Sequence, residues 1–176
     1  SAQLPASAVV DTLDEVFTGF DELAEQHGLE KIKTIGDAYM CAGGLPVQNT
    51  SNPADAVWAA LEICHWVSAW NAQRTSKGLA PWELRIGVNT GDLIAGVIGK
   101  KKFAYDVWGD TVNIAARMES SGEIGKVNIS ASTYEYVKSQ FECEDRGKLP
   151  VKGKEVMNMY FVNGVLNTTD SRNGNG

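Results

Sequence analysis

The sequence predicts an α+β fold in which helices pack on a mixed or antiparallel sheet. The expected elements follow one another as helix, hairpin, helix, hairpin plus strand, helix, strand, helix and strands. This order lacks the strict alternation of a doubly wound sheet. The chain has 176 residues, of which 43% are hydrophobic, and this is enough for one sizeable core.

The first half of the chain contains the two longest predicted helices. Apolar residues recur at three- and four-residue spacing over 7–26, which predicts an amphipathic helix. The stretch EKIKTIGDAYM, residues 30–40, alternates as a hairpin that turns at its Gly-Asp pair. A Gly/Pro/Asn loop follows, and the second long helix begins at Pro53 or Ala54.

The second half combines shorter strands and helices. Thr90-Gly91 separates two strands with small residues, and Asp110 or Thr111 is the expected cap of the helix that follows the next strand. The expected elements are strands within 82–99, a strand at 103–108, a helix at 110–122, a strand at 126–130, a helix at 131–141 and a final pair of strands within 142–162.

Charge and cysteine content exclude several classes of function. The net charge is −6 and the lysines are scattered, whereas a nucleic-acid surface needs a clustered basic footprint, so we expect no nucleic-acid partner. The 3 cysteines lack CxxC spacing, which is typical of apolar fillers in a reducing compartment. We expect a cytoplasmic chain, free or as the cytosolic domain of a membrane-anchored protein, because no apolar run reaches the roughly 20 residues of a membrane span.

Three groups of residues can carry chemistry, and each also has a structural interpretation. Asn113 and Arg117 are four residues apart, so both leave one helical face; they suit a sugar oxygen and a phosphate, or form a solvated surface pair. Asp37 at a turn is a suitable magnesium ligand or simply a turn former. Lys152 and Lys154 flank a glycine, as in a polyphosphate loop or in many surface turns. No P-loop or dinucleotide fingerprint is present.

Four stretches together resemble the class III nucleotidyl cyclase catalytic domain. They are EKIKTIGDAYM, LRIGVNTGDLIAGVIG, FAYDVWGDTVNIAARMESSG and LPVKGKEVMNMYFV, in family order. The resemblance implies a cyclase catalytic domain over 1–162 with a ferredoxin-like fold, followed by a flexible tail at 163–176. It also implies a homodimer that binds nucleotide across its interface.

The resemblance assigns roles to individual residues. Lys33 and Asp106 match the pair that reads the base edge, and a lysine with a carboxylate indicates adenine. Asn113 and Arg117 match the residues that orient the ribose and stabilise charge on the transferring phosphate. Lys152 matches the lysine that binds the terminal phosphates. We therefore expect conversion of ATP to 3′,5′-cyclic AMP and pyrophosphate, by attack of the ribose 3′-oxygen on the α-phosphate.

The family uses two metal ions, Mg²⁺ or Mn²⁺, in each complete site. Asp37 matches one of its two metal-binding aspartates. The other lies in a first strand like FADIVGFT, which would precede Ser1, so we expect a chain that lacks this strand and has little or no turnover by itself.

Two alternatives stay open. A guanylate cyclase with an unusual base pocket is the nearer one, and ATP and GTP turnover distinguishes it. The other is a non-catalytic cyclase-like module that dimerises or senses nucleotide. The presence of Asp37, Asn113 and Arg117 argues against such a module.

Overall fold

The computed structural model describes residues 5–98, 104–151 and 155–166. Its helices and strands follow the predicted order. They are α1 (Ala6–Gln26), β1 (Glu30–Ile35), β2 (Ala38–Ala42), α2 (Asn52–Ser76), β3 (Ile86–Val88), β4 (Ile94–Ile98), β5 (Ala104–Trp108), α3 (Asp110–Ser120), β6 (Val127–Ser130), α4 (Ala131–Val137), β7 (Phe141–Pro150) and β8 (Val156–Val165). The α+β prediction is confirmed.

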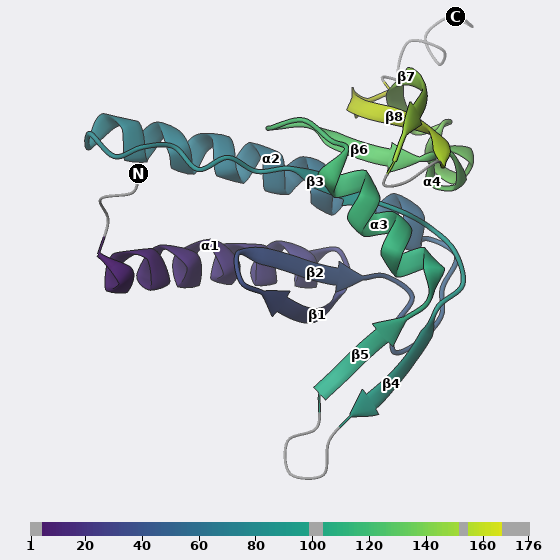
Figure 1. Cartoon of the computed structure of the whole chain (residues 1–176), viewed down its shortest axis with the longest axis horizontal. Coiled ribbons are helices and arrows are strands. Elements are labelled where there is room, and N and C mark those ends of the chain that lie inside the picture. The colour runs from purple at the N-terminus through teal and green to yellow at the C-terminus, as the bar shows by residue number, and fades with distance from the viewer. Residues whose placement is uncertain (1–4, 99–103, 152–154, 167–176) are drawn as a thin grey trace, which may run out of the picture.

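The strands form one mixed sheet and two hairpins. The four-stranded sheet has the order β3-β6-β8-β7, in which β3 and β6 are parallel and the other pairs are antiparallel. Strands β1 and β2 pair with each other, as do β4 and β5. In Figure 1 the β4–β5 hairpin projects from the rest of the molecule. The sheet is therefore mixed, as expected. The two strands around Thr90-Gly91 do not form the predicted hairpin, because β3 joins the sheet beside β6 and β4 pairs with the next strand, β5.

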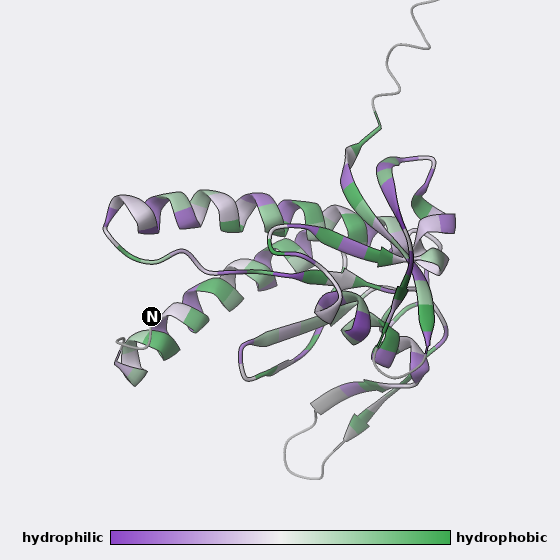
Figure 2. Cartoon of the chain, turned by 45° about the horizontal axis from the view of Figure 1, so that its top comes forward, coloured by the Kyte–Doolittle hydropathy of each residue, from purple (hydrophilic) through white to green (hydrophobic). Residues whose placement is uncertain are grey.

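Helix α2 joins two parts of the core. At one end, its Val57 and Ala60 pack with apolar residues of β6, α4, β7 and β8. Further along, Ile63 and Val67 pack against Val16 and Phe20 of α1. Figure 2 shows polar and apolar residues interleaved along both long helices, as the periodicity predicted. Among the described helices, none has an apolar stretch that could cross a bilayer.

The predicted cap of α3 is wrong. The sequence predicts Asp110 or Thr111 as the cap, but Gly109 occupies this position with φ 126°, and no side chain caps the helix. The positive φ gives glycine an advantage where the chain leaves β5 for α3. The hydroxyl of Thr111 instead donates a hydrogen bond to the carbonyl oxygen of Asp92. Helix α3 is thus tied to the loop after β3.

Strand β8 continues beyond residue 162. Val165 pairs with Phe141 and Gly164 pairs with Glu142, so residues 163–165 complete the ladder with β7. The expected tail at 163–176 thus includes the end of a strand, and residues 167–176 lie outside the described ones.

Candidate active site

Lys33 on β1 and Asp106 on β5 form an ion pair between the two hairpins. The Nζ of Lys33 lies 3.0 Å from Oδ2 of Asp106, although the residues are 73 positions apart. The other carboxylate oxygen accepts a hydrogen bond from the backbone N–H of Val107 at 2.8 Å. This backbone bond, and then the bond from Lys33, lower the pKa of Asp106. The pair therefore presents an ammonium donor beside an ionised carboxylate acceptor.

Asp37 stands at the tip of the β1–β2 hairpin. Gly36, with φ 58°, makes the turn, and the Asp37 side chain is exposed. None of the hydrogen bonds or ion pairs among the described residues involves Asp37. A carboxylate in this position is a suitable oxygen ligand for Mg²⁺, which commonly takes one or two carboxylates and completes its shell with water and phosphate oxygens.

The hairpin that carries Asp37 is attached to α1 through two contacts with Asp21. The hydroxyl of Tyr39 donates a hydrogen bond to Oδ1 of Asp21 at 2.7 Å. The Nζ of Lys31 lies 3.3 Å from the other oxygen of Asp21. Both side chains of the hairpin thus meet one carboxylate of α1, and this anchors the strands on either side of the turn.

Asn113 and Arg117 project from one face of α3, as their spacing predicted. Asn113 is exposed and Arg117 is half-buried. The backbone of α3 lies directly against β3, because a Cβ at Gly87 would come 2.1 Å from the backbone nitrogen of Glu119. Met118, next to Arg117, is fully buried. The sheet therefore fixes the position of this helical face.

An acidic residue that the sequence pattern did not single out contacts Arg117. The Nη1 atom of Arg117 lies 2.7 Å from Oε2 of Glu155, which directly precedes β8. The two residues are 38 positions apart, and no periodicity connects them. The available signal was the position of Glu155 beside the lysines of VKGKE.

Lys152 lies outside the described residues, but both ends of its segment are described. Val151 is buried, and its N–H donates a hydrogen bond to the carbonyl oxygen of Glu155 at 2.9 Å. Val151 also packs in a cluster with Met118 and Met159. The two ends of the lysine segment are thus held beside α3.

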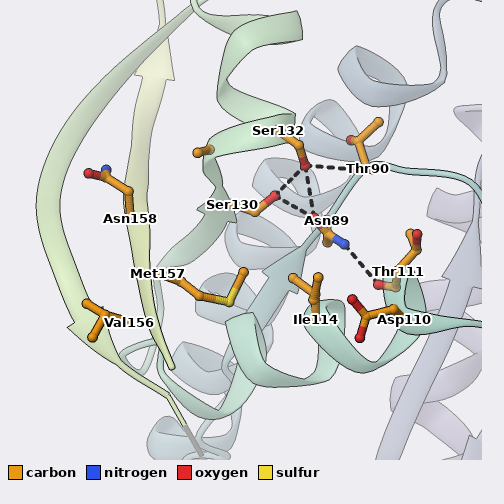
Figure 3. A pocket seen from close by; sticks show the side chains of 11 residues that line it. Asn89, Thr90, Asp110, Thr111, Ile114, Ser130, Ser132, Val156, Met157 and Asn158 are labelled. Carbon is orange, nitrogen blue, oxygen red and sulfur yellow. Dashed lines mark hydrogen bonds between the residues drawn. The ribbon is translucent and has the colours of Figure 1, made fainter. Parts of the chain in front are cut away.

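A separate cavity of about 380 Å³ lies between α3 and the start of β8 (Figure 3). Ile114 of α3, Met157 of β8 and Asn89 are among the residues that line it. The side-chain oxygen of Asn89 accepts hydrogen bonds from Ser130 at 2.6 Å and Ser132 at 3.0 Å. None of the five predicted site residues that the structure describes lines this cavity. Asn89, Ser130 and Ser132 bond one another at this cavity, and we assign it no ligand.

The structure therefore brings together some of the predicted residues. Lys33 contacts Asp106, and Asn113 shares a face with Arg117. No described contact joins Asp37 to either group. Among residues 5–98, 104–151 and 155–166, no three His, Cys, Asp or Glu side chains group closely enough to hold a metal ion. Asp37 is thus an exposed carboxylate that lies outside any such group in the described parts.

Solved structures define the class to which this fold belongs. The guanylate cyclase domain of RhGC from Catenaria anguillulae, solved in complex with GTP, superposes with a TM-score of 0.84 at 34% identity, and the match covers 94% of this chain and 89% of that one. The fold is therefore that of the class III nucleotidyl cyclases. The chain belongs to the adenylate and guanylate cyclase catalytic domain family, which matches residues 1–164.

Curated relatives include both kinds of cyclase. An adenylate cyclase of Mycobacterium tuberculosis is 40% identical over 164 residues, which are 93% of this chain and 36% of the relative. The guanylate cyclase soluble subunit beta-2 of Homo sapiens is also 40% identical, over 163 residues, which are 92% of this chain and 26% of the relative. The chain thus spans about a third of the length of the relatives it matches first. Overall identity does not separate ATP from GTP as the substrate.

Proposed function

We propose that this domain is an adenylate cyclase that converts ATP to 3′,5′-cyclic AMP and pyrophosphate. The observation that supports this proposal is the Lys33–Asp106 pair, with its donor and acceptor 3.0 Å apart. Adenine presents a ring nitrogen acceptor, N1, beside an exocyclic amine donor. The ammonium of Lys33 suits N1, and the ionised carboxylate of Asp106 suits the amine.

A guanylate cyclase is the second candidate, and the relatives favour it as much as they favour the first. A lysine and a carboxylate also match the O6 and N1–H of guanine, in a different register along the base edge. The order of the two side chains along the base edge therefore decides the preference: Lys33 at N1 with Asp106 at the exocyclic group fits adenine, and the exchanged order fits guanine. An assay has to compare both nucleotides under the same conditions.

The remaining site residues take roles around the triphosphate. Asn113 holds the ribose, so that the 3′-oxygen faces the α-phosphate. Arg117 balances the negative charge that develops as the bond from the 3′-oxygen to phosphorus forms and the bond to pyrophosphate breaks. Lys152 binds the terminal phosphates. The proton of the 3′-hydroxyl leaves to water or to a phosphate oxygen of the substrate.

Two divalent ions, Mg²⁺ or Mn²⁺, complete the proposed site, with Asp37 as one ligand. When bound, they lower the pKa of the 3′-hydroxyl and polarise the α-phosphate. The exposed position of Asp37 on a glycine turn leaves room for water and phosphate oxygens in the same shell. Further ligands would come from outside the described contacts.

We also propose a homodimer in which each site takes residues from both subunits. Asp37 makes no described contact with Asp106 or with Arg117. In a two-fold dimer, Asp37 of each subunit can instead meet these residues of the other subunit, and symmetry repeats the arrangement at two sites. Each of the two sites would then take Asp37 from one subunit and the base, ribose and phosphate contacts mainly from the other.

The third candidate is a non-catalytic module. A domain that only senses nucleotide would keep the binding contacts without forming product.

Turnover and binding of ATP and GTP test the proposal, with either Mg²⁺ or Mn²⁺ present. We expect tighter binding of ATP than of GTP, and cyclic AMP as the product. The Lys33→Glu/Asp106→Cys variant should move the ratio toward GTP by roughly 10- to 100-fold, since a desolvated group left unpaired costs about 1–3 kcal/mol. Lys31→Glu, on the same strand but paired with Asp21, is the matched control and should keep the native ratio.

The outcomes separate the three candidates. Native preference for GTP, with cyclic GMP as product, would establish a guanylate cyclase. Nucleotide binding without product under any metal condition, in a chain extended by the strand expected before Ser1, would favour the non-catalytic module. An unchanged ATP-to-GTP ratio in the double variant would remove Lys33 and Asp106 from the base site.

A further inference from the structure

The contact between Arg117 and Glu155 places an acidic side chain where the proposed reaction needs a free cation. The distance from Nη1 to Oε2 is 2.7 Å, which is short for a charge-assisted hydrogen bond. Arg117 is 28% exposed, whereas Glu155 is 66% exposed. The guanidinium is therefore held within the surface, and the carboxylate reaches it from the solvent side.

The backbone around Glu155 keeps its carboxylate near α3. Its carbonyl oxygen accepts a hydrogen bond from the N–H of Val151 at 2.9 Å. Val151 is 5% exposed and packs against Met118, the residue after Arg117. The main chain at Glu155 is thus tied to the same turn of α3 that carries Arg117. The side chain of Glu155 remains free to turn away into solvent without disturbing this packing.

A carboxylate and a phosphate offer arginine equivalent ligands. Both present oxyanions that accept hydrogen bonds from the planar guanidinium, and Arg binds either of them with two parallel N–H donors. Here Glu155 engages one terminal nitrogen of Arg117. The lysines at 152 and 154 precede Glu155 directly in the sequence, so this acid stands at the end of a basic segment.

We propose that Glu155 is a positioning residue for Arg117 that a polyphosphate displaces. In the free protein Glu155 occupies the phosphate position and keeps the guanidinium aligned. When nucleotide binds, its phosphate takes over Arg117 and the Glu155 side chain moves into solvent. When pyrophosphate leaves, Glu155 can take Arg117 back. This inference rests on the proposed function, because it assumes that Arg117 meets phosphate.

The displacement has a measurable cost for anion binding. Binding of a phosphate requires that an exposed ion pair is broken, and such a pair is typically worth about 0.2–1 kcal/mol. Removing the carboxylate should therefore tighten polyphosphate binding by about 1.4- to 5-fold. A carboxylate that served only the fold would change the unfolding midpoint and leave this affinity unaltered.

Calorimetric titration with inorganic pyrophosphate tests the proposal without any need for turnover. Glu155→Gln keeps the shape of the side chain and should bind pyrophosphate about 1.4- to 5-fold more tightly than the native chain. Glu155→Ser, which removes the carboxylate in a different way, should shift the affinity in the same direction. In an Arg117→Ala background, Glu155→Gln should give no such gain, because no guanidinium is left to release.

Glu135→Gln is the matched control. The Glu135–Lys138 pair has the same 2.7 Å separation, and its carboxylate is 64% exposed, but it lies on α4. This variant should bind pyrophosphate as the native chain does.

The results separate this inference from the function on which it rests. If Arg117→Ala weakens pyrophosphate binding and neither Glu155 variant strengthens it, the Glu155 inference is overturned and the role of Arg117 stands. If Arg117→Ala binds pyrophosphate as tightly as the native chain, or the native chain binds none, both the proposed role of Arg117 and the Glu155 inference fail. Where turnover is measurable, Glu155→Gln should lower KM with little change in kcat.

Discussion

At the scale of single residues, Asp106 makes the stability of the Lys33–Asp106 ion pair depend on pH. Hydrogen bonds from the Val107 backbone and from Lys33 lower the pKa of Asp106. The folded-state pKa is thus below the unfolded value of about 3.9. The stabilisation is fully present above that value and is lost as the pH falls through the folded-state pKa.

The lowered pKa of Asp106 predicts how the stability of an Asp106→Asn variant depends on pH. Its urea midpoint should fall below that of the native chain at pH 6, and the difference should shrink as the pH drops below about 4. Lys33→Met should remove only part of the pH-dependent stabilisation. The hydrogen bond from the Val107 backbone, which is the larger cause of the lowered pKa of Asp106, remains in this variant. A constant difference between native chain and Asp106→Asn from pH 6 to pH 3 would contradict the assignment.

Gly87 is the residue that permits close contact between β3 and α3. A Cβ there would lie 2.1 Å from the nitrogen of Glu119 and 2.5 Å from the carbonyl carbon of Met118, and backbone atoms cannot move aside independently. Gly87→Ala should therefore destabilise the fold by about 1–3 kcal/mol or more. Gly164→Ala in β8, where a Cβ meets nothing within 4 Å, is the control. Urea unfolding of both variants makes the comparison, and equal midpoints would contradict the packing argument.

The sequence predicted single residues better than their contacts. The four-residue spacing of Asn113 and Arg117 placed both on one face without further information. In contrast, the Lys33–Asp106 pair joins strands of two different hairpins, so local periodicity contains no sign of it. Only the family resemblance linked these two residues. Glu155 had neither a spacing nor a family signal, and its contact with Arg117 became visible in the folded chain.

At the scale of elements, the β1–β2 hairpin depends on α1 for its position. A two-stranded hairpin is marginally stable by itself, so contacts with neighbouring elements determine where its tip lies. Burial and the hydrogen bond to Asp21 raise the pKa of Tyr39, and this keeps its hydroxyl protonated as the donor. Through this bond, α1 holds the strand that begins just after Asp37.

Tyr39→Phe should weaken this attachment without changing the packing of the ring. The lost hydrogen bond corresponds to about 0.5–1.5 kcal/mol of unfolding free energy. Hydrogen exchange should become faster in β1 and β2 and stay unchanged in β6 and β8. Tyr136→Phe, at an exposed position on α4, is the control. Uniform acceleration across all strands would show that the hydroxyl supports the whole fold instead of this hairpin.

Helices were easier to predict than their ends. Three- and four-residue periodicity identified α1 and α2 because each buries one continuous stripe of apolar side chains. The cap of α3 was predicted from residue preference, but the chain turns too sharply there for Asp110 or Thr111, and Gly109 takes that position. Residue preferences at helix caps do not predict the backbone geometry that the preceding strand imposes.

At the scale of the whole molecule, the order of elements fixed the α+β class but not the division into three sheets. Whether two hairpins join a larger sheet depends on contacts between distant strands, which alternation within one strand does not encode. The β4–β5 hairpin projects from the body and exposes Ile94 and Val97, which are 69% and 61% accessible (Figure 1). Trp108, opposite Ile94 in the ladder, is also exposed.

We expect a partner to cover an exposed apolar ribbon of this kind, and the proposed homodimer would supply a second copy. In a two-fold dimer each substitution acts twice. Burial of one large aliphatic side chain contributes about 1.5–3 kcal/mol, so Ile94→Asp should weaken dimerisation by roughly tenfold or more. Sedimentation equilibrium over a range of concentrations measures this change.

The control is Ile124→Asp. Ile124 is 56% accessible and lies beyond the opposite end of α3, so this variant should dimerise as the native chain does. If Ile94→Asp dimerises like the native chain, this hairpin lies outside the interface, and the shared-site arrangement would need a different contact surface.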